Sequence, residues 1–426
     1  MEHNRHSVAL DVKKCTGCTT CLKHCPTEAI RIRNGHAVIN PDRCIDCGEC
    51  IRVCPHKAKS AVLDSISDIE KFKFKVALPA PSLYAQFENL EEVDYVLQGL
   101  LDIGFDYVYE VSRAAELVSA YTRNYLKTEG IQKPAISSAC PVVVRLIESR
   151  FPSLKDNVIH LLPPMEIAAY LCRQEIKALH PELKDEDIGV CFISPCPAKM
   201  SYVKNGLDNY ESKVDVVISI SDVYFLLINA MNRGKEPTIN SHSGRIGIGW
   251  ASSGGEATAI FNDNYMAADG IENVNRVLDE IENGNIPNLE FVELNACTGG
   301  CVGGVLAIQN PFIAKAKLRG LRSYLPVSQN NLSEEEAKYI PAHYFFEGLS
   351  TYRPISRLSD SMAESMRMMA DIQKLKSSLP GIDCGACGAP TCRAFAEDVV
   401  KGNADINDCI MKHKDKIQEY LKNNKE

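Results

Sequence analysis

Cysteine is the residue type whose number and spacing point most directly to chemistry in this chain. Eight of its 18 cysteines form two identical runs, C-x-x-C-x-x-C-x-x-x-C-P, which begin at Cys15 and Cys44. Three closely spaced thiolates can wrap one iron–sulfur cubane, while a fourth cysteine that is followed by proline turns away from it. Pairs of C-x-x-C thiols also suit tetrahedral zinc, but two identical cysteine–proline runs favour iron. The runs therefore predict two [4Fe-4S] clusters.

Each run has the pattern of a bacterial ferredoxin, in which the fourth cysteine ligates the cluster of the other run. We therefore expect a small α+β, ferredoxin-like domain over residues 1–62 that acts as a two-step electron wire. One cluster is expected on Cys15, Cys18, Cys21 and Cys54, and the other on Cys44, Cys47, Cys50 and Cys25.

A different set of cysteines lies on three separated loops in the middle of the chain. The loops are S-S-A-C-P at 137–141, S-P-C-P-A-K at 194–199 and A-C-T-G-G-C-V-G-G at 296–304. Four thiolates on three loops can assemble one cubane site, and glycines beside Cys301 let the backbone approach a bulky inorganic ligand. We expect this site to be held by Cys140, Cys196, Cys297 and Cys301.

Four more cysteines, spaced C-x2-C-x4-C-x16-C, are Cys384, Cys387, Cys392 and Cys409. This run resembles the small [4Fe-4S] domain of several anaerobic redox proteins, including corrinoid and membrane electron-transport subunits, with zinc as the alternative. We expect a small helical iron–sulfur domain over 379–426, after a linker and helix over 347–378. Methionines recur at helical spacing at Met362, Met366 and Met369. This favours a helix packed on the central domain over an adaptable surface for a signalling partner.

The elements that must position the central loops alternate between strand-like and helix-like segments, which is typical of an α/β domain. We expect this domain over residues 73–346, with its ligand loops after strands, as α/β folds usually place them. The expected strands are 74–78, 135–138, 188–193, 214–218, 245–249 and 289–294, and the expected helices are 90–103, 114–125 and 164–178.

Length and composition are those of a globular protein with more than one domain. The chain has 426 residues, 45% of them hydrophobic and 24% charged, and two or three domains are expected. A formal charge of -8 argues against nucleic acid or an anionic membrane as a partner. The polar first residues predict no signal peptide, and the apolar stretch 216–231 reads as a buried strand and helix. We therefore expect a cytoplasmic protein without a membrane span, whose thiols bind metal.

The three central loops resemble the signature loops of the [FeFe]-hydrogenase catalytic domain, in order and separation, from about Lys73 to Phe346. The motifs P-C-x-A-K at 195–199 and C-x-G-G-C-x-x-G at 297–304 carry most of the resemblance. Ala80-Pro81 and the small-residue loop 251–255 add to it. The resemblance implies an H-cluster, made of a cubane and a two-iron subsite with CO, CN and a bridging dithiolate. Cys301 would bridge the two parts, and Lys199 would donate a hydrogen bond to a cyanide of the distal iron.

The sequence also departs from the pattern of fast hydrogenases. Those enzymes have two adjacent cysteines in the first loop, and the leading one passes protons to the subsite, whereas this chain has Ala139 there. Methionines around the subsite are replaced by Ser194 and Asn295, and two acids of the outer proton path align with Thr122 and Tyr125. Proton transfer by a positioned group contributes orders of magnitude in rate. We therefore expect low turnover.

Three functions fit these features. The first is a sensory or regulatory [FeFe]-hydrogenase that slowly and reversibly oxidises H2 to protons and electrons. Its electrons would pass through four [4Fe-4S] clusters to ferredoxin or another redox protein, and a kinase or phosphatase would carry the signal. The second is a metabolic ferredoxin-dependent hydrogenase. The third is a non-catalytic iron–sulfur electron carrier without the two-iron subsite. The presence of Lys199 argues against this third function, because it favours a bound subsite. The remaining cysteines, Cys172 and Cys191, are expected to be buried packing residues.

Overall fold

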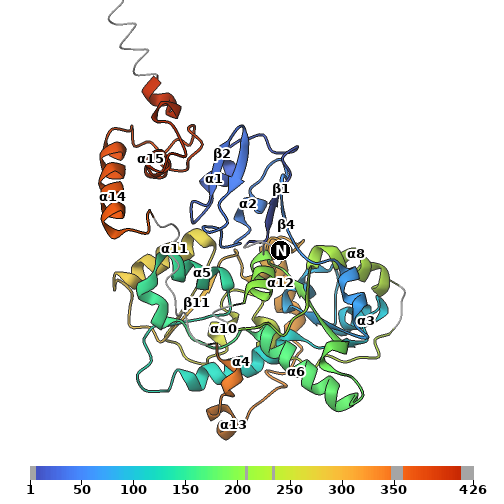
Figure 1. Ribbon diagram of the computed structural model, residues 1–426. Coiled ribbons are helices and arrows are strands. Elements are labelled where there is room, and N and C mark those ends of the chain that lie inside the picture. The colour runs from blue at the N-terminus through green and yellow to red at the C-terminus, as the bar shows by residue number, and fades with distance from the viewer. Residues whose placement is uncertain (1–5, 207–209, 233–235, 347–357, 414–426) are drawn as a thin grey trace, which may run out of the picture. The chain divides into compact units, whose positions relative to one another are not determined.

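The computed structural model describes residues 6–206, 210–232, 236–346 and 358–413, which form two compact units (Figure 1). The larger unit contains the described residues of Met1–Ser7 and Val62–Tyr352, and the smaller contains those of Val8–Ala61 and Arg353–Glu426. The smaller unit thus joins two segments from opposite ends of the sequence. The first part of the expected linker and helix at 347–378, residues 347–357, and the lysine-rich segment 414–426 lie outside the described residues.

The larger unit is built on two parallel sheets, which makes it a mixed α/β domain as expected. The first has the order β6-β5-β8-β9 and the second the order β10-β11-β7. All seven residues of β8 are buried, as is typical of a parallel strand covered on both faces. The strands are β5 (Phe74–Pro79), β6 (Tyr107–Val108), β7 (Ala135–Ile136), β8 (Ile188–Ser194), β9 (Val216–Ser219), β10 (Tyr265–Asp269) and β11 (Phe291–Asn295).

Helices surround these sheets and supply most of the apolar core. Leu97 and Leu100 of α3 pack with Val223 and Leu227 of α8 in one buried cluster. The helices are α3 (Asp94–Asp102), α4 (Val111–Tyr125), α5 (Pro141–Arg150), α6 (Pro164–Leu179), α7 (Pro197–Asn205), α8 (Ile220–Met231), α9 (Arg245–Gly249), α10 (Gly255–Thr258), α11 (Ile271–Glu282), α12 (Pro311–Arg322) and α13 (Glu334–Lys338). Short 3₁₀ helices are η1 (Ile66–Lys71), η2 (Pro81–Gln86), η3 (Pro152–Asn157), η4 (Asp185–Asp187), η5 (Cys301–Gly303) and η6 (Ala342–Tyr344).

One expected strand, at 245–249, is wrong: the segment is the helix α9. Its alternation of isoleucine and glycine imitates a half-buried strand, but the glycines serve close helix packing instead. A Cβ on Gly247 would lie 2.1 Å from the carbonyl oxygen of Ser112 in α4, and one on Gly249 would lie 2.5 Å from Arg322. Only glycine therefore allows α9 to approach α4 so closely.

The smaller unit begins with two copies of one motif, in agreement with the duplicated cysteine runs. Antiparallel pairs join β1 (Val8–Leu10) to β4 (Lys59–Ala61) and β2 (Ile30–Arg33) to β3 (His36–Ile39). The short helices α1 (Thr20–Lys23) and α2 (Glu49–Arg52) each follow a residue in the left-handed region, Thr19 with φ 67° and Gly48 with φ 74°. The two halves thus share backbone conformation as well as sequence.

The rest of the smaller unit consists of α14 (Met362–Ser377), α15 (Cys392–Val400) and η7 (Ile406–Asp408). Ile372 of α14 is buried in a small core with Phe395 of α15. The expectation that the methionine helix packs on the central domain is wrong, because the buried face of α14 contacts α15. Met362 and Met366 on the same helix are 80% and 68% exposed.

Candidate metal centres

The four central thiols line one cavity, in and around which about 890 Å³ of space is not filled by atoms. The cavity lies at the carboxyl ends of β5 and β8 in one parallel sheet and of β7 and β11 in the other. The loop with Cys140 follows β7, the loop with Cys196 follows β8, and the loop with Cys297 and Cys301 follows β11. Lys199 and Ala139 line the same cavity. The structure therefore brings together every side chain that the resemblance assigned to the active site: Cys140, Cys196, Cys297, Cys301 and Lys199.

Cysteine–proline pairs place two of these thiols at helix starts. Cys140 is the N-cap of α5 and Cys196 is the N-cap of α7, and in both helices the following proline occupies the first turn. Proline is favoured there because its fixed φ suits a helix and its missing N–H leaves nothing unsatisfied. Both helix amino termini thus face the cavity, where their partial positive charge stabilises an anionic group.

Glycines allow the third loop to pack against the other two. A Cβ on Gly304 would lie 2.3 Å from the carbonyl oxygen of Pro195, and one on Gly300 would lie 2.4 Å from the amide nitrogen of Ser253. Neither position accepts a side chain without moving the backbone. The glycines around Cys301 therefore bring its loop against the loops at 194–199 and 251–255.

The electrostatics of the cavity favour metal-bound thiolates. Burial raises the pKa of Cys196 to about 12 and also raises that of Cys301, while the charge of Lys199 acts in the opposite direction on both. Thiols with such pKa values stay protonated at neutral pH unless a metal replaces the proton. The donor set thus fits a cluster whose binding releases protons, next to a cation that compensates its negative charge.

A buried hydroxyl that sequence reasoning missed points into this site. Ser82 in η2 is wholly buried and lines the cavity, and its Oγ has no hydrogen-bond partner among the described residues. Such orphaned groups are rare because burying an unpaired hydroxyl is costly. Ser82 directly follows Ala80-Pro81, which is one of the motifs that support the resemblance, but Ser82 itself is not part of that motif. It fits a ligand that accepts a hydrogen bond.

Two buried carboxyl groups, Glu256 and Glu293, also line the cavity and were not predicted. Glu293 accepts hydrogen bonds from the amides of Gly254 and Ala257, at 3.0 and 2.8 Å, and from Nδ2 of Asn295 at 2.6 Å. Burial, and then the neighbouring Glu293 charge, raise the pKa of Glu256 to about 8. Burial also raises the pKa of Glu293, but the hydrogen bonds that it accepts oppose this. Glu256 is therefore the member of the pair that keeps its proton at neutral pH.

A second, smaller cavity of about 220 Å³ shares Ala139, Trp250 and Glu256 with the main one and is also lined by Thr122. Ser137 in its wall donates a 2.6 Å hydrogen bond to Glu256. Of the two positions aligned with outer proton-path acids, Thr122 thus lines the same small cavity as Ser137 and Glu256. Tyr125 does not: it lines an open surface hollow near Glu129 and Lys338.

The two positions that replace methionines have local structural partners. Ser194 is wholly buried, and its Oγ accepts from the amide of Cys196 at 3.1 Å and donates to the Cys196 carbonyl at 2.9 Å. Asn295 donates to Glu293 as described. Ser194 therefore shapes the loop that carries a thiol, and Asn295 holds the carboxyl pair.

In the smaller unit the amino-terminal cysteines lie in two sets, each with three cysteines of one run and the fourth cysteine of the other. One hollow of about 340 Å³ is lined by Cys25 together with Cys44, Cys47 and Cys50. Burial raises the pKa of Cys21 most, and further contributions come from the charges of Cys18, Cys15 and Cys54, which places these four thiols together. Cys25 and Cys54 thus each lie with the set from the other run.

A buried lysine lies between these two sets. Lys59 is 4% exposed, and its Nζ has no hydrogen-bond partner among the described residues. Burial raises the pKa of Cys21, and raises that of Cys50 to about 12, and the charge of Lys59 is the largest influence opposing burial on both. The equivalent position in the first run is Ile30, which is also buried. A buried cation without a protein partner fits a nearby anionic cluster.

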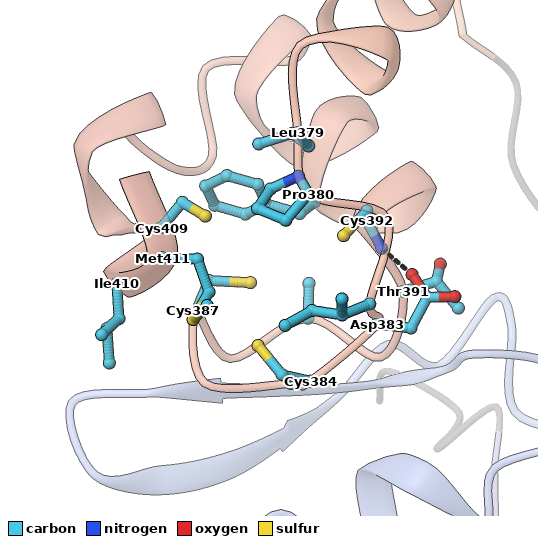
Figure 2. Close-up of a pocket in the computed structure, with 14 residues that line it drawn as sticks. Leu379, Pro380, Asp383, Cys384, Cys387, Thr391, Cys392, Cys409, Ile410 and Met411 are labelled. Atoms are coloured by element: carbon cyan, nitrogen blue, oxygen red, sulfur yellow. Dashed lines mark hydrogen bonds between the residues drawn. The ribbon is translucent and has the colours of Figure 1, made fainter. Parts of the chain in front are cut away.

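The tail cysteines surround a third hollow of about 340 Å³ (Figure 2). Cys384 and Cys387 come from a loop, Cys392 begins α15, and Cys409 follows η7. Asp383 accepts a 2.6 Å hydrogen bond from the amide of Cys392, which ties the loop to the helix. The structure therefore brings all four together around a space equal in size to that of a ferredoxin site.

The two remaining cysteines, Cys172 and Cys191, are fully buried, as expected for packing residues. Burial raises the pKa of both thiols, that of Cys172 to about 12, so neither is reactive at neutral pH. Within the described part of the chain, no helix is both long and apolar enough to cross a membrane.

The fold and these thiol sets define an iron–sulfur protein with a buried centre inside an α/β domain. A family model described as iron only hydrogenase large subunit, C-terminal domain, matches residues 73–262 and 252–305, which is more than half of the chain. The chain therefore belongs to this family. A 4Fe-4S dicluster domain matches residues 7–55, and an Fe-S cluster domain matches residues 379–411.

Curated relatives agree with this assignment. Iron hydrogenase 1 of Clostridium pasteurianum is 22% identical over 382 residues, covering 71% of this chain and 65% of the relative. A component of the ion-translocating oxidoreductase complex of Thiobacillus denitrificans is 51% identical over 37 residues, covering 9% of this chain and 20% of the relative. The chain thus spans less than two thirds of the length of both. A variant of the [FeFe]-hydrogenase HydA1 from Chlamydomonas reinhardtii aligns with a TM-score of 0.45 at 16% identity, covering 58% of this chain and 84% of that one. The chain is thus an iron–sulfur protein related to [FeFe]-hydrogenases.

Proposed function

We propose that this protein is a slow, sensory [FeFe]-hydrogenase that reversibly oxidises H2 to protons and electrons. The observation that carries the proposal is the composition of one buried cavity. Four thiols, the Lys199 cation and the orphaned Ser82 hydroxyl line it together. A site for a cubane alone would have no evident use for the last two groups.

The residues of the cavity suit the two parts of an H-cluster. Cys140, Cys196, Cys297 and Cys301 would hold the cubane, and Cys301 would also join the two-iron subsite. Lys199 and Ser82 would donate hydrogen bonds to its anionic ligands, and charge-assisted bonds of this kind are strong inside a dry pocket. When bound, the cofactor supplies the splitting of hydrogen and takes up the electrons, while the protein supplies ligation, orientation and electrostatics.

The proton relay is the step in which this chain differs from fast enzymes. Ala139 has no transferable proton, so the position next to Cys140 does not provide one. Glu256 holds a proton at neutral pH and lines the cavity, and Ser137 connects it to the smaller cavity beside Thr122. We propose that protons leave through this carboxyl pair. Because Glu256 has a raised pKa, it accepts a proton readily and releases it slowly, which fits low turnover and a sensory role.

Infrared spectroscopy tests the proposal most directly. Protein matured with the hydrogenase assembly factors should show carbon monoxide and cyanide bands, and these should disappear in Cys301→Ala while the amino-terminal clusters remain. Cys172→Ala, which removes a buried thiol outside every cluster set, is the matched control and should retain the bands. A matured protein without such bands would be the third candidate, an electron carrier that keeps only cubanes.

Turnover separates the sensory from the metabolic form of the proposal. A sensory enzyme should oxidise H2 slowly with ferredoxin or a dye as acceptor, and its rate should not rise with acceptor concentration. A fast, acceptor-limited rate would instead support the metabolic ferredoxin-dependent hydrogenase. For the sensory form, binding of a kinase or phosphatase should depend on whether the protein is under H2.

A further inference from the structure

We propose that the carboxy-terminal module is a built-in redox partner of the ferredoxin-like domain, exchanging electrons directly with the cluster on Cys15, Cys18, Cys21 and Cys54. The proposal rests on the cubanes of the proposed function but not on the two-iron subsite. The two parts are far apart in sequence, yet they form one compact unit. In Figure 1, α15 lies beside β2 and α1.

Charged residues of opposite sign hold the two parts together. Asp398 on α15 accepts 2.6 Å hydrogen bonds from Nε of Arg31 and from Nη2 of Arg33, and the Asp398 side chain is only 11% exposed. Arg43 forms a second ion pair with Glu397, and both side chains are largely buried. Desolvated pairs of this kind fix one geometry, because moving either partner leaves a buried charge uncompensated.

The contact also involves the backbone of the loop that carries two tail ligands. The amide of Ile32 in β2 donates a 2.9 Å hydrogen bond to the carbonyl of Gly388, which follows Cys387 directly. A Cβ on Gly388 would lie 2.2 Å from the carbonyl oxygen of Ile32. The absence of a side chain at this position therefore allows the loop to meet β2 as an added hydrogen-bonded edge.

The same loop meets the helix that carries Cys21. A Cβ on Gly385 would lie 2.9 Å from Cε of Lys23 and 3.5 Å from a methyl carbon of Leu22. Lys23 also donates to the carbonyl of Pro390 at 3.4 Å. Gly385 follows the ligand Cys384, and Leu22 follows the ligand Cys21. One van der Waals gap therefore separates residues that are bonded directly to a ligand of each cluster.

This arrangement suits one-electron transfer. A reduced cubane on one side loses an electron and an oxidised cubane on the other gains it, so no bond forms and no proton moves. Tunnelling rates fall steeply with distance, and both ligand loops are in contact. The surroundings are apolar and packed, with Leu22 and Phe395 fully buried. The carboxy-terminal module therefore exchanges electrons within the chain, as a part that is docked on the ferredoxin-like domain.

The test uses the full chain with its cubanes but without the two-iron subsite, so that it does not depend on hydrogenase activity. In reduced wild-type protein, electron paramagnetic resonance should show magnetic interaction between the tail cluster and an amino-terminal cluster. Asp398→Lys should remove this interaction and slow electron redistribution after photoreduction at least tenfold. Asp371→Lys, an equal charge change at an exposed position of α14, should change neither.

A second pair of variants guards against misfolding of the tail. Gly388→Ala should have the same effect as Asp398→Lys, because its Cβ meets β2. Gly402→Ala is matched in backbone, with φ 74° against 77°, but has open space around its Cβ and should behave as wild type. Iron and sulfide content must stay unchanged in all four. A tail that binds zinc, or interaction and rates that are equal in wild type, Asp398→Lys and Gly388→Ala, would overturn the proposal.

Discussion

Replacing Lys59 by methionine should lower the reduction potentials of the ferredoxin-like clusters. Lys59 is a buried cation without a protein partner among the described residues, and it lies near Cys21 of one set and Cys50 of the other. A positive charge stabilises the reduced, more negative form of a cubane over the oxidised form. Methionine keeps the unbranched shape and removes the charge, so the reduced form should become harder to reach.

The size of the shift follows from Coulomb's law. Two unit charges 4 Å apart interact by about 4 kcal/mol at an effective dielectric constant of 20. The extra electron of a reduced cubane is spread over the cluster and its sulfurs, so about half of this is reasonable for a group in its outer shell. About 2 kcal/mol corresponds to about 90 mV for a one-electron couple, since a tenfold change is about 59 mV.

Potentiometric titration followed by electron paramagnetic resonance measures this shift for each cluster. Lys57→Met is the matched control, because it removes the same charge from an exposed position two residues away and should shift the potentials far less. Cluster-free Lys59→Met should also unfold at higher denaturant concentration than wild type, because a buried unpaired charge has been removed. Potentials that move no further than those of Lys57→Met would refute the reasoning.

Three further variants test the central domain. Ala139→Cys in matured protein should raise H2 turnover by about tenfold or more, because it supplies the missing proton donor, and an unchanged rate would contradict our account of low activity. Glu256→Gln should lower turnover. In cluster-free wild type, the folded carboxyl keeps its proton up to about pH 8 and the unfolded one only to 4.5. The unfolding free energy of wild type should therefore fall by up to about 1.4 kcal/mol per pH unit as the pH rises through that interval. Denaturant titrations should show that Glu256→Gln removes this pH dependence. Gly247→Ala should destabilise the protein by about 2 kcal/mol or more through its clash with α4, whereas Gly320→Ala, which meets nothing within 4 Å, should stabilise it slightly.

The cysteine sets of the two runs and of the tail were predictable because spacing alone encodes them. Most of their thiols recur at short intervals that suit a cubane, whereas the central set lies on three separated loops and was predicted from the resemblance of its motifs. The loops at Cys140 and Cys196 also follow predicted strands, so their position at the carboxyl ends of strands was foreseeable. That the two strands, β7 and β8, lie in different sheets was not. Residues 245–249 were misread because a period of two also arises when every second residue is a glycine in a closely packed helix.

The carboxyl pair and the tail contact could not be read in the same way. Glu256 and Glu293 meet only through tertiary structure, and the one available signal was a charged residue inside the apolar run of β11. Arg31 and Asp398 are 367 residues apart, and no local pattern links such a pair. Lys59 was within reach, because alignment of the two cysteine runs sets it opposite Ile30, where a charge is out of place.

The joining of both ends of the sequence into one unit has a consequence for how the protein is made. Residues 8–61 are synthesised first, but Arg31, Arg33 and Arg43 meet their acidic partners only after α15 has been synthesised. Contacts of such high sequence separation form late, because a long chain must be closed to make them. The larger unit can therefore complete its folding while the arginines are still accessible to solvent. Docking of the tail then follows, and it reports that the chain has been synthesised as far as α15.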